Sequence, residues 1–394
     1  SMDLDFNFTS CINCGQCLNV CPTGALHEKQ NIPEVQEYLS NKDFLKVIQY
    51  TPLVPASVAA ELGIKPPKDF DRVLNGILRR MGFNKVFHSG FGTDILIEEI
   101  ADEIIGKNDS GFDEPLYVSA CPAWVKYAEQ SLPNELKNLS VLKPPLQITG
   151  ALVKTLVSSL SGIKPQQIYS VAVTPCTAMK FEARRDSMMT KGICDIDTVL
   201  TVRELARLIR LYGIDTAGTE GEPADEPMAL SSASAILAET AGGIAEGVVR
   251  SVFLKSAGKI PDRKIFKNIR NSTSFRDAQF TTGTMNFSVA IVDGLAGMGK
   301  LREALSAGRK YNLIEVMACS GGCVNGGGMS PCRTKEDLKT RIKQVYQSEE
   351  SALIQSPSAS PPVLNFYEKH MKNTEILKDK KVLHTSFSKR DVLL

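Results

Sequence analysis

This 394-residue chain has few histidines, few long apolar runs and no marked excess of either charge. No stretch approaches the roughly 18–20 uncharged residues that a membrane-spanning helix needs, and the N-terminus shows no secretory signal pattern. The net charge of +2 gives no broad electrostatic footprint for nucleic acid. We therefore expect a cytoplasmic protein whose partners include neither membrane nor nucleic acid. The four histidines form no zinc-binding or nucleophile constellation; they are His27, His88, His370 and His384.

Cysteine, by contrast, is frequent and clustered. Disulfide scaffolds are short and cysteine-dense, whereas clustered cysteines in a long chain from a reducing compartment indicate metal binding. The ten cysteines are Cys11, Cys14, Cys17, Cys21, Cys121, Cys176, Cys194, Cys319, Cys323 and Cys332. Their spacing, rather than their number, is therefore the main signal in this sequence.

The order of apolar patterns predicts an α/β fold. From about residue 31 to 350, β-branched runs alternate with helical patterns, which is typical of parallel strands layered with helices. Strands are predicted at 47–50, 116–119, 168–173, 288–292 and 313–317, and clear helices at 125–130 and 202–212. The Gly-, Pro- and acid-rich stretch 217–229 predicts a surface loop, and the Ser/Pro-rich stretch 351–362 predicts a linker before the tail 363–394.

The first cysteine group has the spacing of a bacterial ferredoxin run. With Pro22, the cysteines at 11, 14, 17 and 21 fit C-x2-C-x2-C-x3-C-P. Gly15 allows the backbone to approach a cluster closely. A zinc knuckle is the alternative, but zinc sites usually pair two separated arms or include histidines. We expect one [4Fe–4S] cluster here that moves electrons to or from the interior, with Cys11, Cys14, Cys17 and Cys21 as candidate ligands.

The fourth ligand of this cluster is open. In two-cluster ferredoxins the last cysteine of such a run serves the other cluster, and this chain holds a single run. Either Cys21 binds the same cluster as the other three cysteines, or a remote thiol such as Cys194 or Cys332 is the fourth ligand. The third possibility is that a preceding run belongs to a longer protein. Iron and sulfide counts in wild type and Cys21→Ser would decide.

Four further cysteines share one layout, in which an apolar strand ends at a sharp turn that carries cysteine. Because ligands gather beyond the carboxyl ends of strands in α/β sheets, this layout aims four thiols at one place. Pro122 suits a first helical position, which puts the preceding cysteine at a helix N-terminus that favours thiolate. The glycines at 321–328 would let a bulky cofactor lie against backbone. One such cysteine alone indicates a buried structural thiol, but three matching contexts favour a shared site: Cys121, Cys176, Cys319 and Cys323.

The segments 116–124, 171–182 and 314–328 resemble the three signature loops of the [FeFe] hydrogenases, and the similarity extends from the ferredoxin run to 383–385. The resemblance implies that these four cysteines hold a cubane and that Cys323 also bridges it to a diiron unit with CO, cyanide and azadithiolate. Together they form the H-cluster, which splits or forms H2. The resemblance also implies a two-lobed domain with helix-flanked β-sheets. We divide the chain into a ferredoxin-like module (1–35), an H-cluster domain (36–350) and a linker with a tail packed on that domain (351–394).

The sequence departs from this family at the proton-relay position. Catalytic members carry a cysteine before the first-loop ligand, and here the residue is Ala120, which has no exchangeable proton. Further along the usual relay, Glu99, Asp102 and Ser140 fall where the family places two acids and a serine. For Glu99 and Asp102, a solvated helix face is the alternative.

The second loop departs as well. The lysine that donates a hydrogen bond to a cyanide in the family falls on Met179, and the adjacent Lys180 points about 100° away on a helix. Met317 matches the family. Losing a cationic donor is expected to shift the potential and vibrational frequencies of the diiron unit. Two other positions also differ from the family pattern: Thr174 and Leu53.

These departures resemble the sensory branch of the family, so the sequence predicts an H2 sensor with slow, reversible H2 oxidation and proton reduction. Its expected partners are H2, protons, maturation proteins that install the diiron unit, and a redox partner such as ferredoxin or a signalling protein. One alternative is a fully catalytic hydrogenase with another proton route, near Glu99 or Lys180. The other is a non-catalytic Nar1-type iron–sulfur assembly protein, which keeps related cysteines but holds only cubanes.

Overall fold

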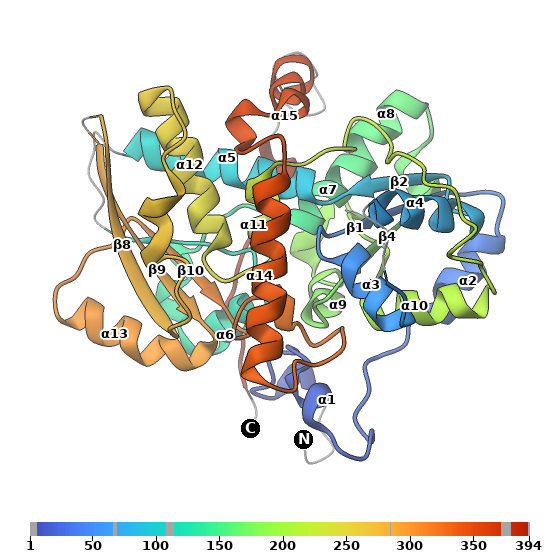
Figure 1. Ribbon diagram of the computed structural model, residues 1–394, viewed down its shortest axis with the longest axis horizontal. Helices are drawn as coiled ribbons and strands as arrows, with labels where there is room; N and C mark the ends of the chain where they lie inside the picture. The colour runs from blue at the N-terminus through green and yellow to red at the C-terminus, as the bar shows by residue number, and fades with distance from the viewer. Residues whose placement is uncertain (1–5, 66–68, 108–113, 284, 372–379, 393–394) are drawn as a thin grey trace.

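Two four-stranded sheets form two lobes in the computed structural model, which describes residues 6–65, 69–107, 114–283, 285–371 and 380–392. Helix α14 (Lys335–Ser351) runs between the lobes, and the N-terminal module lies below them (Figure 1). The predicted α/β fold with parallel strands is confirmed. Within the described residues, no helix combines the length and apolar character needed to cross a membrane.

The first sheet is entirely parallel, and its strand order places a crevice at its carboxyl edge. The chain passes from β1 to β2 on one side and later adds β4 on the other side of β1. Such a switch point between β1 and β4 opens a crevice beyond the strand ends, where α/β proteins bind ligands. The strands, in spatial order, are β2 (Lys85–His88), β1 (Leu45–Tyr50), β4 (Ile168–Thr174) and β7 (Thr198–Thr201).

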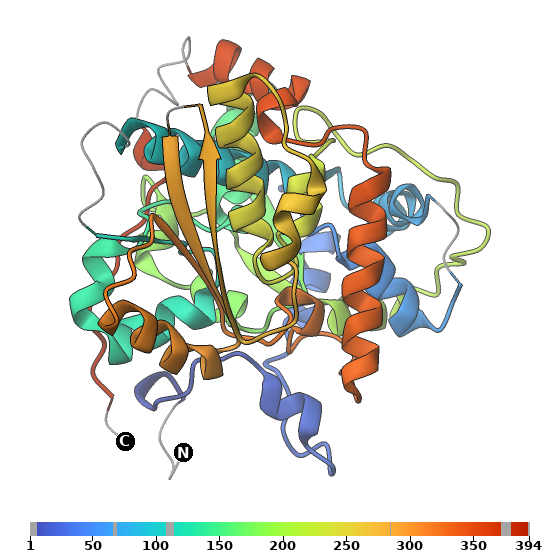
Figure 2. The same ribbon diagram turned by 60° about the vertical axis from the view of Figure 1, so that its left-hand side comes forward.

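The second sheet is parallel except at one edge. Its last two strands form a long antiparallel pair, seen face-on in Figure 2. The carboxyl ends of its first two strands lie at the same edge, so the residues that follow them are neighbours. The spatial order is β3 (Leu116–Tyr117), β10 (Leu313–Met317), β9 (Met285–Asp293) and β8 (Phe275–Thr282), and a separate small hairpin joins β5 (Met189–Thr190) to β6 (Ile193–Cys194).

Helices cover both sheets, and one of them joins the lobes. Helix α5 (Gly90–Lys107) is buried on nearly all sides, because it packs against α7 on one face and α12 on another. The remaining helices are α1 (Gln16–Val20), α2 (Ile32–Ser40), α3 (Val54–Leu62), α4 (Phe70–Arg80), α6 (Pro122–Ser131), α7 (Pro145–Leu152), α8 (Ser158–Ser161), α9 (Ala178–Glu182), α10 (Val202–Leu211), α11 (Ala233–Leu237), α12 (Gly243–Ala257), α13 (Met298–Ser306) and α15 (Pro361–Phe366).

Two segments with little regular structure are packed more tightly than their composition suggests. The stretch 217–229 is a loop, as predicted, but Met228 is fully buried and Arg79 forms ion pairs with Glu222 and Asp225 at 3.0 and 2.7 Å. The predicted linker 351–362 is packed against the domain, where Ser356 and Ser360 are fully buried. The Ser356 hydroxyl shares a hydrogen bond with that of Ser251 at 3.2 Å, whereas the Ser360 hydroxyl has no hydrogen-bond partner among the described residues. Composition alone does not reveal this packing.

Candidate functional site

The four interior cysteines lie directly beyond the carboxyl ends of three strands from both lobes. Cys121 follows β3 as the N-cap of α6, and Cys176 follows β4 immediately before α9. Cys319 and Cys323 follow β10. The switch-point crevice of the first sheet therefore faces the corresponding edge of the second, and the thiols converge where the two lobes meet.

The thiols lie close enough to affect one another electrostatically. Burial raises the pKa of Cys176 well above the ordinary range, and Cys121 and Cys319 raise it further. Burial and Cys121 raise the pKa of Cys319 to about 12. The pKa of Cys323 is raised by burial, then by Glu239 and the other three thiols. Without metal these groups are neutral thiols, and a cationic iron centre is what would make them thiolates.

The helix N-terminus and burial have opposite effects on the pKa of the Cys121 thiol. The backbone N–H groups of Ala318, Trp124 and Ala123 lower the pKa of its thiol, in the direction predicted from Pro122. Burial acts in the opposite direction and is larger, so the net pKa is raised. The helix position alone therefore does not produce a free thiolate.

The donor set fits a cluster better than a single ion. Among the described residues, no three Cys, His, Asp or Glu side chains are placed to hold one metal ion together. In a cubane each thiolate binds a different iron, so the four sulfurs stand farther apart than the ligands of one ion. Four mutually interacting thiols of this kind match the four-cysteine ligation of iron–sulfur clusters.

The glycine run of the third loop has a packing role that the sequence did not predict. A Cβ at Gly326 would lie 2.3 Å from the carbonyl oxygen of Pro175, and one at Gly322 would lie 2.6 Å from the nitrogen of Ala241. The atoms that these glycines approach are thus protein backbone, from the second loop and from the segment before α12. Their small size lets three stretches of chain meet around the cysteines.

The N-terminal module wraps its cysteines around a tight turn. Gly15 has φ of 72° and Asn13 has φ of 58°, both in the left-handed region. The pKa of Cys14 is raised by burial, then by Cys11 and Cys17, so these three thiols share one place. The pKa of the fourth, Cys21, is lowered to about 7, chiefly by the backbone N–H of Leu26.

The two other cysteines considered as remote ligands lie elsewhere. Cys194 is on the β5–β6 hairpin, and after burial the largest influence on its pKa comes from Asp197. Cys332 precedes α14, and after burial Arg341 is the largest influence on its pKa. The identity of the fourth ligand stays a prediction for Cys21.

The module is docked directly on the loops that carry the interior cysteines. The amide nitrogen of Gln16 lies 3.2 Å from Sγ of Cys319, and Thr177 Oγ1 donates to the carbonyl of Asn13 at 2.8 Å. A Cβ on Gly327 would lie 2.3 Å from the carbonyl oxygen of Cys14. A cluster in the module would therefore sit beside the interior site, as electron transfer between them requires.

Comparison with protein families matches both parts of the chain. Residues 45–327 match the model described as "Iron only hydrogenase large subunit, C-terminal domain". The chain belongs to the iron-only hydrogenase large-subunit family. Residues 4–27 match a 4Fe–4S binding domain, so iron–sulfur cofactors are implied for both regions.

Individual relatives resemble the chain over most of its length. It is 33% identical over 400 residues to the NADP-reducing hydrogenase subunit HndD of Solidesulfovibrio fructosivorans, covering 100% of this chain and 68% of that protein. It is also 29% identical over 405 residues to Protein NAR1 of Arabidopsis thaliana, covering 96% of this chain and 84% of that protein. A solved structure of a variant of apo [FeFe]-hydrogenase HydA1 from Chlamydomonas reinhardtii superposes with a TM-score of 0.78 at 25% identity, covering 92% of this chain and 100% of that one.

The candidate proton-relay residues of this family member lie in two places. Ala120 is buried and directly precedes Cys121. The backbone N–H of buried Ser140 donates to the carbonyl of Tyr117 at 2.8 Å, so Ser140 lies beside β3, the strand that leads to Cys121. Glu99 accepts a hydrogen bond from the Tyr367 hydroxyl at 2.9 Å. Their roles in proton transfer stay predictions. Asp102 is exposed and forms an ion pair with Lys255 at 2.6 Å, which places it away from the thiols on the outer surface of α5.

The candidate residues of the second and third loops divide in the same way. Met179 is buried in a cluster with Cys176, and Met317 is buried at the end of β10. Lys180 points elsewhere: it forms an ion pair with Glu204 at 2.6 Å and donates to the carbonyl of Lys29 at 2.7 Å. Lys180 therefore ties the last part of the N-terminal module to α10.

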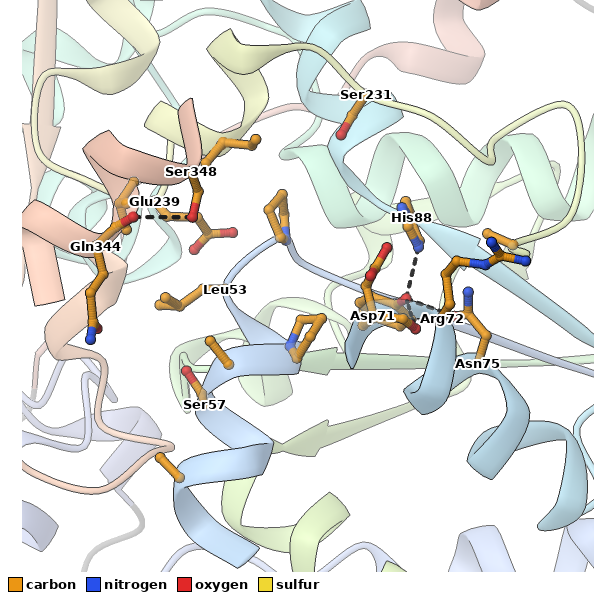
Figure 3. A pocket seen from close by; sticks show the side chains of 18 of the residues that line it. Leu53, Ser57, Asp71, Arg72, Asn75, His88, Ser231, Glu239, Gln344 and Ser348 are labelled. Carbon is orange, nitrogen blue, oxygen red and sulfur yellow. Dashed lines mark hydrogen bonds between the residues drawn. The ribbon is translucent and has the colours of Figure 1, made fainter. Parts of the chain in front are cut away.

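A cavity of about 710 Å³ adjoins this site along the carboxyl edge of β1 and β2 (Figure 3). At one end the Tyr50 hydroxyl is 2.7 Å from both Nε2 of His88 and Oδ1 of Asn75. Burial lowers the pKa of His88 and raises that of Tyr50, so the imidazole and the phenol are both neutral, while Asp71 and Arg72 also line this end. Leu53 lies toward the opposite end, where Figure 3 shows it on the same side of the cavity as Glu239.

Glu239, at the opposite end of the cavity, is a candidate that the sequence did not reveal. Burial raises the pKa of its carboxyl to about 7, while the Thr51 hydroxyl and the Leu53 backbone N–H oppose this rise. It also raises the pKa of Cys323, so the carboxyl lies near that thiol. The stretch around it is rich in small residues and carries no motif, so only the fold brings it to the site. A buried carboxyl with a shifted pKa in a cavity is a candidate acid–base group.

Proposed function

We propose that this chain is an H2 sensor built on the [FeFe]-hydrogenase fold, which turns H2 over slowly and reversibly. One observation carries the proposal: four thiols of the hydrogenase type come together, and the residue before the first of them is Ala120. Cys121, Cys176, Cys319 and Cys323 would hold the cubane of the H-cluster, with Cys323 bridging to the diiron unit. When bound, the H-cluster supplies heterolytic cleavage and formation of H2.

The alanine limits proton transfer. The Ala120 methyl group is buried and can neither donate nor accept a proton, so the last step of the usual relay has no carrier. A positioned general acid or base typically contributes about 10²–10⁴ in rate. We expect turnover to be slower than in a catalytic family member by about that factor, which suits detection of H2 better than bulk consumption.

The second loop supports the same proposal. Met179 replaces a cationic donor with an apolar thioether, and Lys180 is held by Glu204 on the far side of α9. No positive side chain among the described residues of this loop therefore reaches the place where the family's lysine acts. Weaker hydrogen bonding there is expected to lower the potential of the diiron unit.

Electrons would enter or leave through the N-terminal module. Cys17 is exposed while the other end of the module contacts the interior loops, so the module lies between solvent and the site. The chain would exchange electrons with a ferredoxin or a signalling protein at that exposed side. Maturation proteins would install the diiron unit, and we place the protein in the cytoplasm, where its ten cysteines stay reduced.

The experiment compares H2 turnover by the matured wild type, Ala120→Cys and the control Ala128→Cys. Ala128 is a buried alanine farther along α6, so its variant adds a thiol to the same helix away from the site. We expect Ala120→Cys to raise turnover by up to about 10²–10⁴ and Ala128→Cys to leave it unchanged. Wild-type turnover at rates normal for the family would refute the sensor role.

A catalytic enzyme with a different proton route is the second candidate, and Glu239 is the observation that favours it. The carboxyl faces the cavity and lies near Cys323, so protons could pass from cavity water to the site without Ala120. Glu239→Gln keeps the shape and removes the acid. High wild-type turnover that falls by more than about tenfold in Glu239→Gln would support this route over the sensor role.

A non-catalytic assembly protein is the third candidate, favoured by the similarity to Protein NAR1 over 96% of the chain. Such a protein would hold only cubanes. The buried Met317 and the glycine run of the third loop support the hydrogenase alternative, since both belong to the hydrogenase pattern around the diiron pocket. Infrared bands of CO and cyanide in the matured protein would exclude the assembly role.

A further inference from the structure

Gln16 stands between two cysteines of the N-terminal module, and its side chain reaches the interior site. It is the first residue of α1, directly after Gly15 in the left-handed region at φ 72°. Its amide nitrogen lies 3.2 Å from Sγ of Cys319 and 2.7 Å from the carbonyl oxygen of Asn325. The two N–H bonds of the amide thus have one acceptor each, and one of them is a predicted cluster ligand.

The second acceptor fixes the orientation of this amide. The carbonyl of Asn325 lies on the loop that carries Cys323, so it holds one N–H while the other is directed at the sulfur. Gly15 makes the approach possible, because a Cβ there would lie 2.4 Å from Thr177 Oγ1. The donor is therefore preset by the fold and does not depend on a mobile side chain.

An N–H donated to a cluster-binding sulfur changes the redox properties of the cluster. The hydrogen bond withdraws electron density from the thiolate and stabilises the more negative, reduced state, so it raises the reduction potential. Burial is the largest influence on the pKa of the Cys319 thiol. A hydrogen bond is stronger in such buried surroundings than in solvent. The same donor lowers the pKa of the Cys319 thiol against the effect of burial.

We propose that Gln16 is a positioning residue that couples the two iron–sulfur centres: it raises the reduction potential of the cubane bound through Cys319, and it belongs to the ligand loop of the N-terminal cluster. This inference rests on the proposed function in that the interior cubane must be present. Because Cys14 and Cys17 flank Gln16, a change at the N-terminal cluster acts on the donor that tunes the interior one. The Gln16 side chain thus connects the two ligand sets through a single hydrogen bond.

The test uses the full chain loaded with iron and sulfide alone, without the diiron unit, and follows both clusters by EPR during redox titration. Gln16→Leu removes the donor at similar size. Thr177→Val is the matched control, since it removes the module's hydrogen bond to Asn13 and leaves Cys319 untouched. We expect Gln16→Leu to lower the ratio of reduced to oxidised interior cubane about tenfold at fixed potential, which is ~59 mV for one electron. In Thr177→Val the ratio of reduced to oxidised interior cubane at the same potential should stay within about twofold of wild type.

Gln16→Lys separates tuning from docking, because it keeps an N–H donor at this position. If the interior cubane of Gln16→Lys has a reduction potential at or above that of wild type, the proposal is supported. This holds even if Gln16→Leu loses iron. A Gln16→Leu potential equal to that of Thr177→Val, or a Gln16→Lys potential as low as Gln16→Leu, would overturn it while leaving the proposed function intact. A wild-type chain that binds only the N-terminal cluster would overturn the proposed function, and this inference with it.

Discussion

Burial raises the pKa of several carboxyl groups in this protein. Burial raises the pKa of Glu315 to about 7, although its two oxygens accept hydrogen bonds from Gly242 and Ala245 at 2.8 and 2.7 Å. Glu315 thereby holds the N-terminus of α12 against β10, the strand that leads to Cys319. The acid at the start of the third-loop motif thus has a structural role that positions the ligand-bearing loop.

Asp94 provides a pH-dependent prediction at this scale. Burial raises the pKa of its carboxyl to about 7, against the hydrogen bonds from the Ser232 backbone and hydroxyl. The folded state therefore keeps a proton that the unfolded state releases near pH 4, so the free energy of unfolding falls as pH rises from about 4 to about 7. The shift corresponds to roughly 4 kcal/mol.

Thermal melts of wild type and Asp94→Asn between about pH 4 and pH 7 measure this effect. Asparagine can accept from the Ser232 backbone and donate to its hydroxyl, so we expect the variant to fold and to lose part of the pH dependence. Asp43→Asn, at an exposed position, is the control and should follow wild type. Equal slopes for wild type and Asp94→Asn would contradict the assignment.

The cysteines of the candidate site could be predicted from their spacing, whereas most of the residues around them could not. The ferredoxin run and the three strand–turn–cysteine segments are local patterns, so Cys121 and Cys176 could be identified without a structure. Glu239 and Gln16 have no local signature, because each reaches the site only through the packing of distant segments. Lys180 illustrates the converse: its proximity to Cys176 in sequence does not bring its side chain to the thiols.

At the scale of elements, the glycine run joins the module to the interior loops. Gly327→Ala would place a methyl group 2.3 Å from the Cys14 carbonyl, and backbone on both sides leaves little room to adjust. We expect the variant to loosen the module, so that limited proteolysis near residue 30 becomes faster and the N-terminal cluster is lost first. Iron content and EPR of each cluster report this loss.

Gly299→Ala is the matched control, since Gly299 lies on α13 and a Cβ there has nothing within 4 Å. A helical glycine in open space should gain about 0.4–1 kcal/mol on substitution by alanine. If Gly327→Ala behaved like Gly299→Ala, the close approach between the third loop and the module would be wrong.

Helix α14 is held to the second lobe by a buried ionic cluster. Glu349 is fully buried, and its carboxylate lies 2.8 Å from Arg250, 3.0 Å from Arg263 and 3.2 Å from Arg270. Removing one partner from such a cluster typically costs about 3–5 kcal/mol. We expect Glu349→Ala to lower the thermal midpoint strongly, whereas Glu350→Ala at the exposed neighbouring position should change stability by about 0.5 kcal/mol or less. Similar midpoints for the two variants would contradict this role.

Strands that are long and apolar could be predicted from the sequence. The strands predicted at 168–173 and 313–317 are β4 and β10, both buried along their whole length. β2 and β7 escape prediction, because both are four residues long and begin and end on polar or charged residues. β8 escapes it as well, since this edge strand is only partly buried and so lacks a continuous apolar run.

At the scale of the whole molecule, the site exists only because two lobes face each other. The first lobe contributes Cys176 at its switch point, and the second contributes Cys121, Cys319 and Cys323. Helix α5 fills the space between the lobes, and α14 covers the cavity that leads to Glu239. This relative placement of the lobes could be predicted from the family resemblance but not from strand and helix patterns.

The central claim is that four thiols from both lobes hold one cubane that carries a diiron unit. Infrared spectroscopy of the chain supplied with a diiron precursor, under argon and under H2, tests it most directly. We expect CO and cyanide bands that shift between the two gases in wild type and in Cys332→Ala, and that are absent in Cys323→Ala. A wild-type protein that contains its cubanes but shows no such bands would contradict the account.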